Sequence, residues 1–158
     1  MKRRTVLTGL AALGLVQTPM AQAQVTAEDI PNDRLYSDDH MWVLIAGGVA
    51  TIGLTAYATV SLGEIVFVGY SSFPNETVDD GDAIADVEAL KTTAEINAPI
   101  SGQIVEVNTK LDADGEDMPH LLNETPYTDS WLVKIRINQQ DLSHLMDAAA
   151  YRKSLDED

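Results

Sequence analysis

Short β-forming runs separated by turn residues are the feature that most constrains how this chain can fold. Trp42 to Ala46 and Val49 to Leu54 are rich in strand formers and flank Gly47-Gly48, which predicts a hairpin with a two-residue turn. Similar short runs recur along the chain, and there is no long alternation of strands with helices. The pattern therefore favours an all-β fold with minor helices, in the form of a sandwich or flattened barrel.

The other periodic stretches predict the remaining elements. Apolar or alternating residues predict further strands over 64–69, 83–90, 92–98, 103–107 and 131–137. Residues 56–62 predict a helical turn, and apolar residues at helical spacing over 140–151 predict an amphipathic C-terminal helix. Because Phe67 and Trp131 each lie in a predicted strand among apolar neighbours, both are expected to be aromatic residues of the core.

The first 23 residues differ from the rest of the chain. They contain three basic residues and no acidic residue, and the apolar stretch over 6–16 is too short to span a bilayer. With the Arg3-Arg4 pair and Ala21-Gln22-Ala23 as a cleavage site, residues 1–23 are predicted to be a signal peptide of the twin-arginine type, which implies an exported, periplasmic protein. The alternatives are a transit peptide, an amphipathic helix, or a cytoplasmic protein whose translation starts at Met20.

The remainder of the chain is expected to hold one folded domain. Residues 24–34 are predicted to form an N-terminal tail, residues 35–151 the domain, and residues 152–158 an acidic C-terminal tail. No stable membrane insertion is expected, since the longest apolar stretch is the short one in the predicted signal peptide.

Composition and motifs exclude several functions. Ten basic against 25 acidic residues give a net charge of −15, which argues against nucleic acid because phosphate binding needs a basic surface. The chain has no cysteine, so it has no thiolate nucleophile or cysteine-based metal site. His40, His120 and His144 lack the spacing of metal ligands, and no hydrolase, P-loop or dinucleotide motif is present. We therefore predict no catalytic residue and no metal site, and any redox chemistry would need an added group.

Lys91 lies between the two predicted strands over 83–90 and 92–98, with Glu88 three residues before it. A lysine that carries a covalent group must protrude to reach several enzymes, and a hairpin tip held by rigid strands provides that position. A neighbouring acid such as Glu88 could guide the modifying enzyme. The residues alone leave open that Lys91 is an ordinary exposed lysine.

Four segments of the chain, in this order and spacing, resemble the H proteins of the glycine cleavage system. They are Tyr-Ser-Asp-Asp-His-Met-Trp at 36–42, Leu-Gly-Glu-Ile-Val-Phe-Val at 62–68, Val-Glu-Ala-Leu-Lys-Thr at 87–92 followed by Asn-Ala-Pro-Ile-Ser-Gly at 97–102, and Asn123 with Pro126-Tyr127 and Trp131. The resemblance covers residues 35–151. It implies a barrel-sandwich hybrid with a lipoyl group on Lys91, and it implies that Glu88 helps the lipoate-attaching enzyme to recognise the hairpin.

The resemblance also implies the role of such a carrier. It would shuttle an aminomethyl intermediate on the lipoyl-lysine among glycine decarboxylase, an aminomethyltransferase and dihydrolipoyl dehydrogenase, without catalysing a reaction itself. One alternative is an H-protein-like lipoate carrier for sulfur oxidation or another redox pathway, since glycine cleavage is not an extracytoplasmic process. A biotin carrier is a further alternative, but Leu90 and Thr92 stand where such carriers have methionines beside the lysine.

Overall fold

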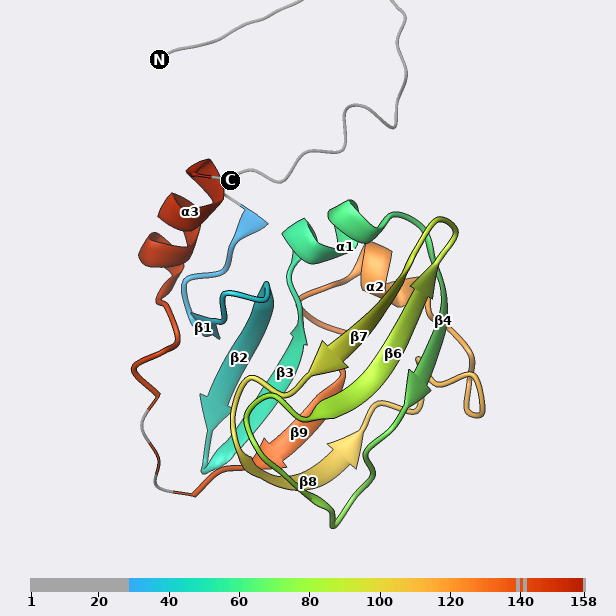
Figure 1. The fold of residues 1–158 in the computed structure, drawn as a ribbon, viewed down its shortest axis with the longest axis horizontal. Helices are drawn as coiled ribbons and strands as arrows, with labels where there is room; N and C mark the ends of the chain where they lie inside the picture. The colour runs from blue at the N-terminus through green and yellow to red at the C-terminus, as the bar shows by residue number, and fades with distance from the viewer. Residues whose placement is uncertain (1–28, 139, 141, 158) are drawn as a thin grey trace, which may run out of the picture.

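The computed structural model describes residues 29–138, 140 and 142–157, so the predicted signal peptide lies outside the described residues (Figure 1). Nine strands and three helices are found in these ranges. The strands are β1 (Leu35–Tyr36), β2 (Met41–Ala46), β3 (Val49–Leu54), β4 (Ile65–Tyr70), β5 (Thr77–Val78), β6 (Ala83–Ala89), β7 (Thr93–Asn97), β8 (Gly102–Val107) and β9 (Val133–Arg136). The helices are α1 (Ala56–Leu62), α2 (Leu121–Glu124) and α3 (Ala148–Asp156).

The strands form two antiparallel sheets, a six-stranded sheet in the order β1-β2-β3-β9-β8-β5 and a three-stranded sheet in the order β4-β6-β7. Figure 1 shows the small sheet in front of the strands of the large one, with α3 at one side of the molecule. The predicted fold class, mainly β with minor helices and a helix near the C-terminus, is confirmed. No helix in the described ranges is long and apolar enough to cross a membrane.

The β2–β3 hairpin forms at the predicted place. Ala46 pairs with Val49, and Gly47 and Gly48 between them have φ of 59° and 77°. Positive φ at both central residues is the geometry of the turn that matches the twist of a two-residue hairpin, and glycine adopts it without a Cβ clash.

The main core lies between the two sheets. Alternate residues of the strands point into it, as in β6, where Val87 is fully buried between the exposed residues Asp86 and Glu88. The large sheet contributes residues such as Ile52 and Ile104, both fully buried. This core fixes the register of β4, β6 and β7, because a slip of one residue would turn each apolar side chain to solvent.

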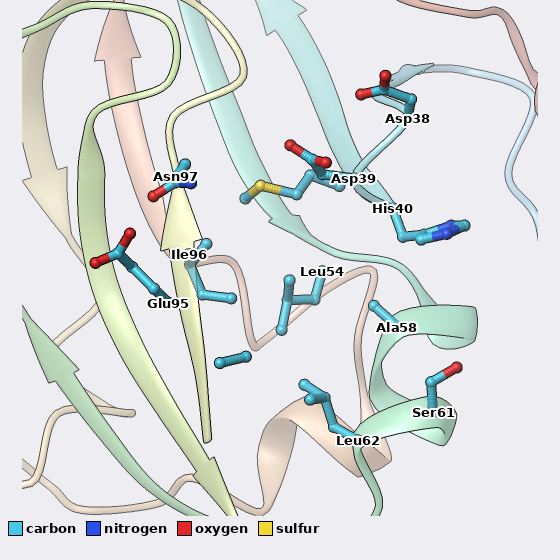
Figure 2. Close-up of a pocket in the computed structure, with 12 residues that line it drawn as sticks. Asp38, Asp39, His40, Leu54, Ala58, Ser61, Leu62, Glu95, Ile96 and Asn97 are labelled. Atoms are coloured by element: carbon cyan, nitrogen blue, oxygen red, sulfur yellow. The ribbon is translucent and has the colours of Figure 1, made fainter. Parts of the chain in front are cut away.

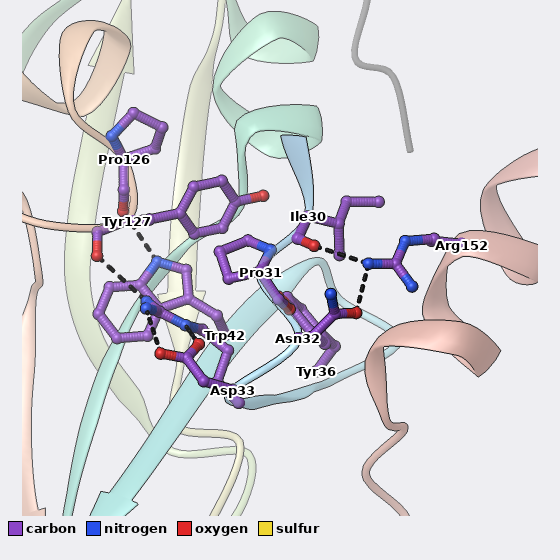
Figure 3. Close-up of polar contacts among 10 residues, drawn as sticks. Ile30, Pro31, Asn32, Asp33, Tyr36, Trp42, Pro126, Tyr127 and Arg152 are labelled. Atoms are coloured by element: carbon purple, nitrogen blue, oxygen red, sulfur yellow. Dashed lines mark hydrogen bonds and ion pairs between the residues drawn. The ribbon is translucent and has the colours of Figure 1, made fainter. Parts of the chain in front are cut away.

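A second, aromatic cluster joins both ends of the described chain. Tyr36 and Tyr151 stack with their ring centroids 4.6 Å apart, and both are fully buried. Ile30 is only 2% exposed in the same cluster, and Arg152 donates to its carbonyl oxygen at 2.9 Å and also to Asn32 (Figure 3). Residues from both predicted tails, 24–34 and 152–158, are therefore packed in this cluster.

The bounds of the C-terminal helix also differ from the prediction over 140–151. The helix begins only at Ala148, after Asp147, whose side chain accepts a hydrogen bond from the amide of Ala150 at 2.8 Å. Before it, Met146 pairs with Tyr36 as an isolated β-bridge, with backbone hydrogen bonds of 2.7 and 2.8 Å. Leu142 and Leu145, which precede Met146 in a turn, pack against the main core, and helical spacing alone could not distinguish this arrangement from a helix.

The two aromatic residues predicted for the core are not fully buried. Trp131 is half-buried and packs at the margin of the aromatic cluster, with the Lys134 ammonium 4.7 Å from its ring centroid. Phe67 is half-buried too, and a Cβ added at Gly69 would lie 2.9 Å from its ring. Because that ring covers a glycine of its own strand, Phe67 does not enter the core. The buried aromatic residues are Tyr36, Trp42 and Tyr151 instead.

Candidate functional site

The β6–β7 hairpin places Lys91 at its tip. Glu88 pairs with Thr93, and the amide of Ala89 donates to the carbonyl oxygen of Thr92 at 2.8 Å. Leu90 and Lys91 are left outside the ladder, and both side chains are exposed, Leu90 to 68%. In Figure 1 this tip stands beyond the ends of the neighbouring strands, next to α1 and α2.

The tip is held from below and from one side. Val87, Ala89 and Ile96 are buried beneath it, which fixes the two strands on the core. The amide of Leu90 also donates to the carbonyl oxygen of Glu64 at 3.0 Å, which ties the tip to the start of β4. Lys91 is therefore an exposed side chain on an anchored backbone, and no hydrogen bond or ion pair from the described residues engages its amine.

Glu88 lies on the same hairpin, on the outer face of the small sheet. It pairs with Phe67 of β4 on one side and Thr93 of β7 on the other, and the next exposed pair along these strands is Asp86 with Glu95. The carboxylates make this outer face acidic. Within the described ranges Glu88 forms no ion pair with Lys91, so the structure brings the two predicted residues to one end of one hairpin without direct contact.

A pocket of about 400 Å³ lies beside β7, which we call the arm-side pocket. Its apolar wall is formed by Met41, Leu54, Ala58, Leu62, Ala94 and Ile96. Asp38, Asp39 and Glu95 also line it, and Figure 2 shows the Glu95 carboxylate directed away from the apolar side chains Leu54, Leu62 and Ile96. The pocket begins at Ala94, three residues from Lys91, which is about 10 Å along a strand.

His40 lines the same pocket and connects it to α3. It has a left-handed backbone, with φ of 66°, and its Nδ1 lies 2.9 Å from the Tyr151 hydroxyl. That hydroxyl is also 2.9 Å from the Thr55 hydroxyl, and the His40 ring packs on Tyr57 with centroids 4.4 Å apart. The arrangement uses His40 as a structural link. Sequence reasoning could not find this network, because Tyr151 lies 111 residues away.

The other two histidines lie elsewhere. His144 is not on the C-terminal helix, and its Nε2 lies 2.8 Å from the Pro99 carbonyl oxygen and 3.5 Å from Asp80. His120 immediately precedes α2. No group of three or more His, Asp or Glu side chains that could hold a metal is found in the described part of the chain.

The pKa shifts imposed by the fold fall away from the Lys91 hairpin. Burial raises the pKa of the phenols of Tyr36, Tyr70 and Tyr127. A hydrogen bond from Arg34 lowers the pKa of the Asp33 carboxyl. Tyr70 illustrates the structural character of these groups, because its hydroxyl donates to two backbone carbonyl oxygens, those of Asn108 and Leu132.

Comparison with known proteins adds to this geometry. The sequence model of the family described as glycine cleavage H-protein matches residues 34–158. A glycine cleavage system H protein of Staphylococcus epidermidis is 44% identical over 129 residues, which is 81% of this chain and 98% of the relative, and that of another strain is 43% identical over the same shares. This chain belongs to the glycine cleavage H-protein family.

The fold agrees with that membership. The crystal structure of a glycine cleavage system H protein from Mycobacterium marinum matches with a TM-score of 0.68 at 36% sequence identity, over 80% of this chain and 99% of that one. The barrel-sandwich hybrid expected from the resemblance is thereby confirmed. As a member of the H-protein family, the chain is a non-catalytic lipoyl carrier of the glycine cleavage system, and the sulfur-oxidation and biotin alternatives find no support among these relatives.

Proposed function

We propose that Lys91 is the residue that carries the lipoyl group in this H-protein family member. The observation that carries the proposal is the position of its amine, exposed at a two-residue hairpin tip and unengaged by the described residues. An amine in this setting can form an amide with the carboxyl group of lipoate without disturbing any packed side chain. A lysine inside a strand, such as Lys134, which pairs with Glu106 and lies over Trp131, is less suited.

A lipoyl group held by Lys91 would supply the disulfide that can carry an aminomethyl group from glycine decarboxylase to an aminomethyltransferase and that dihydrolipoyl dehydrogenase would regenerate. The chain contributes position. Its hairpin backbone is anchored by the Leu90–Glu64 hydrogen bond and by the buried Val87 and Ile96, so the point of attachment is fixed while the side chain moves.

The arm-side pocket is where the chain would hold the arm between enzymes. Its apolar wall, with Leu54, Leu62 and Ile96, suits the hydrocarbon part. The carboxylate of Asp39 suits a positively charged amino group, because opposite charges attract most where water is partly excluded. Burial there would protect the group from water during transfer from one enzyme to the next.

The test is modification mapping. The full chain, made in a host that lipoylates proteins, is digested and analysed by mass spectrometry, with the expectation that the lipoyl mass is found on Lys91. An unmodified Lys91, or a lipoyl group on Lys110, Lys134 or Lys153, would contradict the proposal. The modified protein should then support glycine cleavage with the three partner enzymes.

We further propose that residues 1–23 direct export after lipoylation, because a twin-arginine route accepts folded, cofactor-bearing proteins. The alternative is a cytoplasmic carrier that starts at Met20, which suits the partners of the glycine cleavage system. Cell fractionation with N-terminal sequencing distinguishes them. An extracytoplasmic product that begins near Gln24 supports export, and a cytoplasmic product that begins at Met1 or Met20 contradicts it.

A further inference from the structure

A second hollow lies on the other side of helix α1 from the arm-side pocket. It has a volume of about 450 Å³ and runs between the end of α1, the start of β4 and α2. Its lining includes Thr59, Val60, Gly63, Glu64, Asn123 and Glu124, and we call it the tip groove. The function proposed above, in which Lys91 carries the lipoyl arm and the arm-side pocket holds it, does not involve this groove.

The tip groove is rigidly joined to the Lys91 site. Asn123 of α2 accepts a hydrogen bond from the Ile65 amide and donates one to the Gly63 carbonyl oxygen, both at 2.9 Å, which fixes α2 to the α1–β4 connection. The adjacent residue, Glu64, accepts the hydrogen bond from Leu90 at the hairpin tip. Figure 1 shows α1, α2 and the hairpin tip gathered at one end of the molecule.

Helix α1 separates the two hollows. Ala58, Ser61 and Leu62 line the arm-side pocket, whereas Thr59 and Val60 line the tip groove. A protein bound in the tip groove would therefore contact the side of α1 opposite the arm-side pocket. It would also lie within reach of Lys91. This is the position that an enzyme receiving the arm needs.

The chemistry of the groove selects its occupant. Val60 is 44% exposed within it and Leu90 is 68% exposed beside it, so apolar surface is open to solvent at this end. The ionisable residues that line the groove are Glu64, Glu124 and His120, and its lining residues include no lysine or arginine. An apolar floor with carboxylates beside it fits a lysine or arginine whose carbon stem lies on the floor while its charge meets the acids.

A second copy of this chain does not supply that side chain readily. With a net charge of −15, two copies repel each other. The occupant is therefore expected to belong to a different protein with a basic surface.

We propose that the tip groove is a docking site for the enzymes that work on the lipoyl arm, which insert a lysine or arginine side chain over Val60 between Glu64 and Glu124. The inference rests on the proposed function of Lys91. In this proposal the groove recognises the partner enzyme, and the lipoyl arm carries the aminomethyl group.

The test compares two charge-reversed proteins of equal net charge. Glu64→Lys with Glu124→Lys alters the groove, and Glu116→Lys with Glu157→Lys alters two exposed acids outside it. Each full-length protein is prepared lipoylated, as verified by mass, and assayed below saturation with the three glycine cleavage enzymes. For the groove variant we expect kcat/KM of glycine cleavage to fall about tenfold, with the loss diminishing as salt rises, and for the control a change of at most about twofold.

The outcomes separate the two proposals. If the unsubstituted lipoylated protein does not support glycine cleavage, the function proposed for Lys91 fails. If it does and both variants match it, only the docking site fails. A groove variant that is lipoylated more slowly but is fully active once lipoylated would assign the groove to the lipoate-attaching enzyme and overturn the proposal. Val60→Ser, which leaves all charges in place, should also lower kcat/KM, by about threefold.

Discussion

At the Lys91 end of the molecule two residues protrude from a hairpin with few contacts, whereas at the α3 end the side chains of Ile30, Tyr36, Trp42 and Tyr151 are buried against one another. In the first region the amine of Lys91 is exposed, and the hairpin around it is held by backbone hydrogen bonds. In the second, the Trp42 indole donates to the Pro126 carbonyl oxygen at 2.8 Å while the Arg34 guanidinium covers its ring at 4.7 Å (Figure 3).

The two regions therefore have different roles: the Lys91 hairpin presents the carrier residue, and the aromatic cluster at α3 stabilises the fold. A carrier residue has to leave its own protein and enter several others, so any contact that fixed it would oppose its function. The ends of the chain have the opposite requirement, because an unanchored β1 or α3 would leave the edge of the large sheet open. Substitutions in the two regions should therefore affect different measurements.

The largest effect is expected from Lys91→Arg. The guanidinium keeps the positive charge but cannot form the amide with lipoate, so lipoylation and glycine cleavage should be lost entirely. Because the side chain is exposed, the free energy of unfolding should change by at most about 0.5 kcal/mol. Intact mass and urea denaturation, measured on one preparation, check both parts. A clear loss of stability would show that Lys91 also has a structural role.

Trp42→Ala should lower stability but leave lipoylation intact. Trp42 is 1% exposed, and its removal should lower the free energy of unfolding by about 3–5 kcal/mol. Any protein that remains folded should still be lipoylated at Lys91. Trp131→Ala is the matched control, since Trp131 is only half-buried, and it should cost about 1–2 kcal/mol. Equal losses from the two substitutions would contradict the assignment of Trp42 to the centre of the aromatic cluster.

Tyr151→Phe isolates the polar part of the same region. The substitution keeps the stacked ring on Tyr36 and removes the hydroxyl that lies 2.9 Å from both His40 Nδ1 and Thr55 Oγ1. The buried Thr55 and the half-buried His40 would each lose a partner, which should cost about 1–2 kcal/mol in the free energy of unfolding. Thermal unfolding with and without the substitution measures it. No change in stability would mean that water replaces the hydroxyl.

Local patterns could be predicted from the sequence, and long-range packing could not. The Gly47-Gly48 turn and the alternation on both sides of Lys91 are set by neighbouring residues, so both hairpins were predicted at their observed places. The position of Phe67 was not, since a continuous apolar run does not say which side chains face the core. Ile30 and Tyr151 lie far apart in sequence, and only the fold shows that they share one cluster.

The smallest effect concerns Glu88, and it tests whether the Lys91 end is recognised by charge as well as by shape. Glu88 is exposed on the outer face of the small sheet and forms no ion pair within the described ranges, so Glu88→Gln should leave the free energy of unfolding within about 0.5 kcal/mol. If the lipoate-attaching enzyme reads its charge, kcat/KM of lipoylation should fall about threefold, because one rim charge contributes mainly to the rate of association. Asp86→Gln is the matched control, since Asp86 lies on the same face of β6 but one exposed position further from the tip. Equal rates for both variants would mean that the net charge of this face, rather than the position of Glu88, guides the enzyme to Lys91.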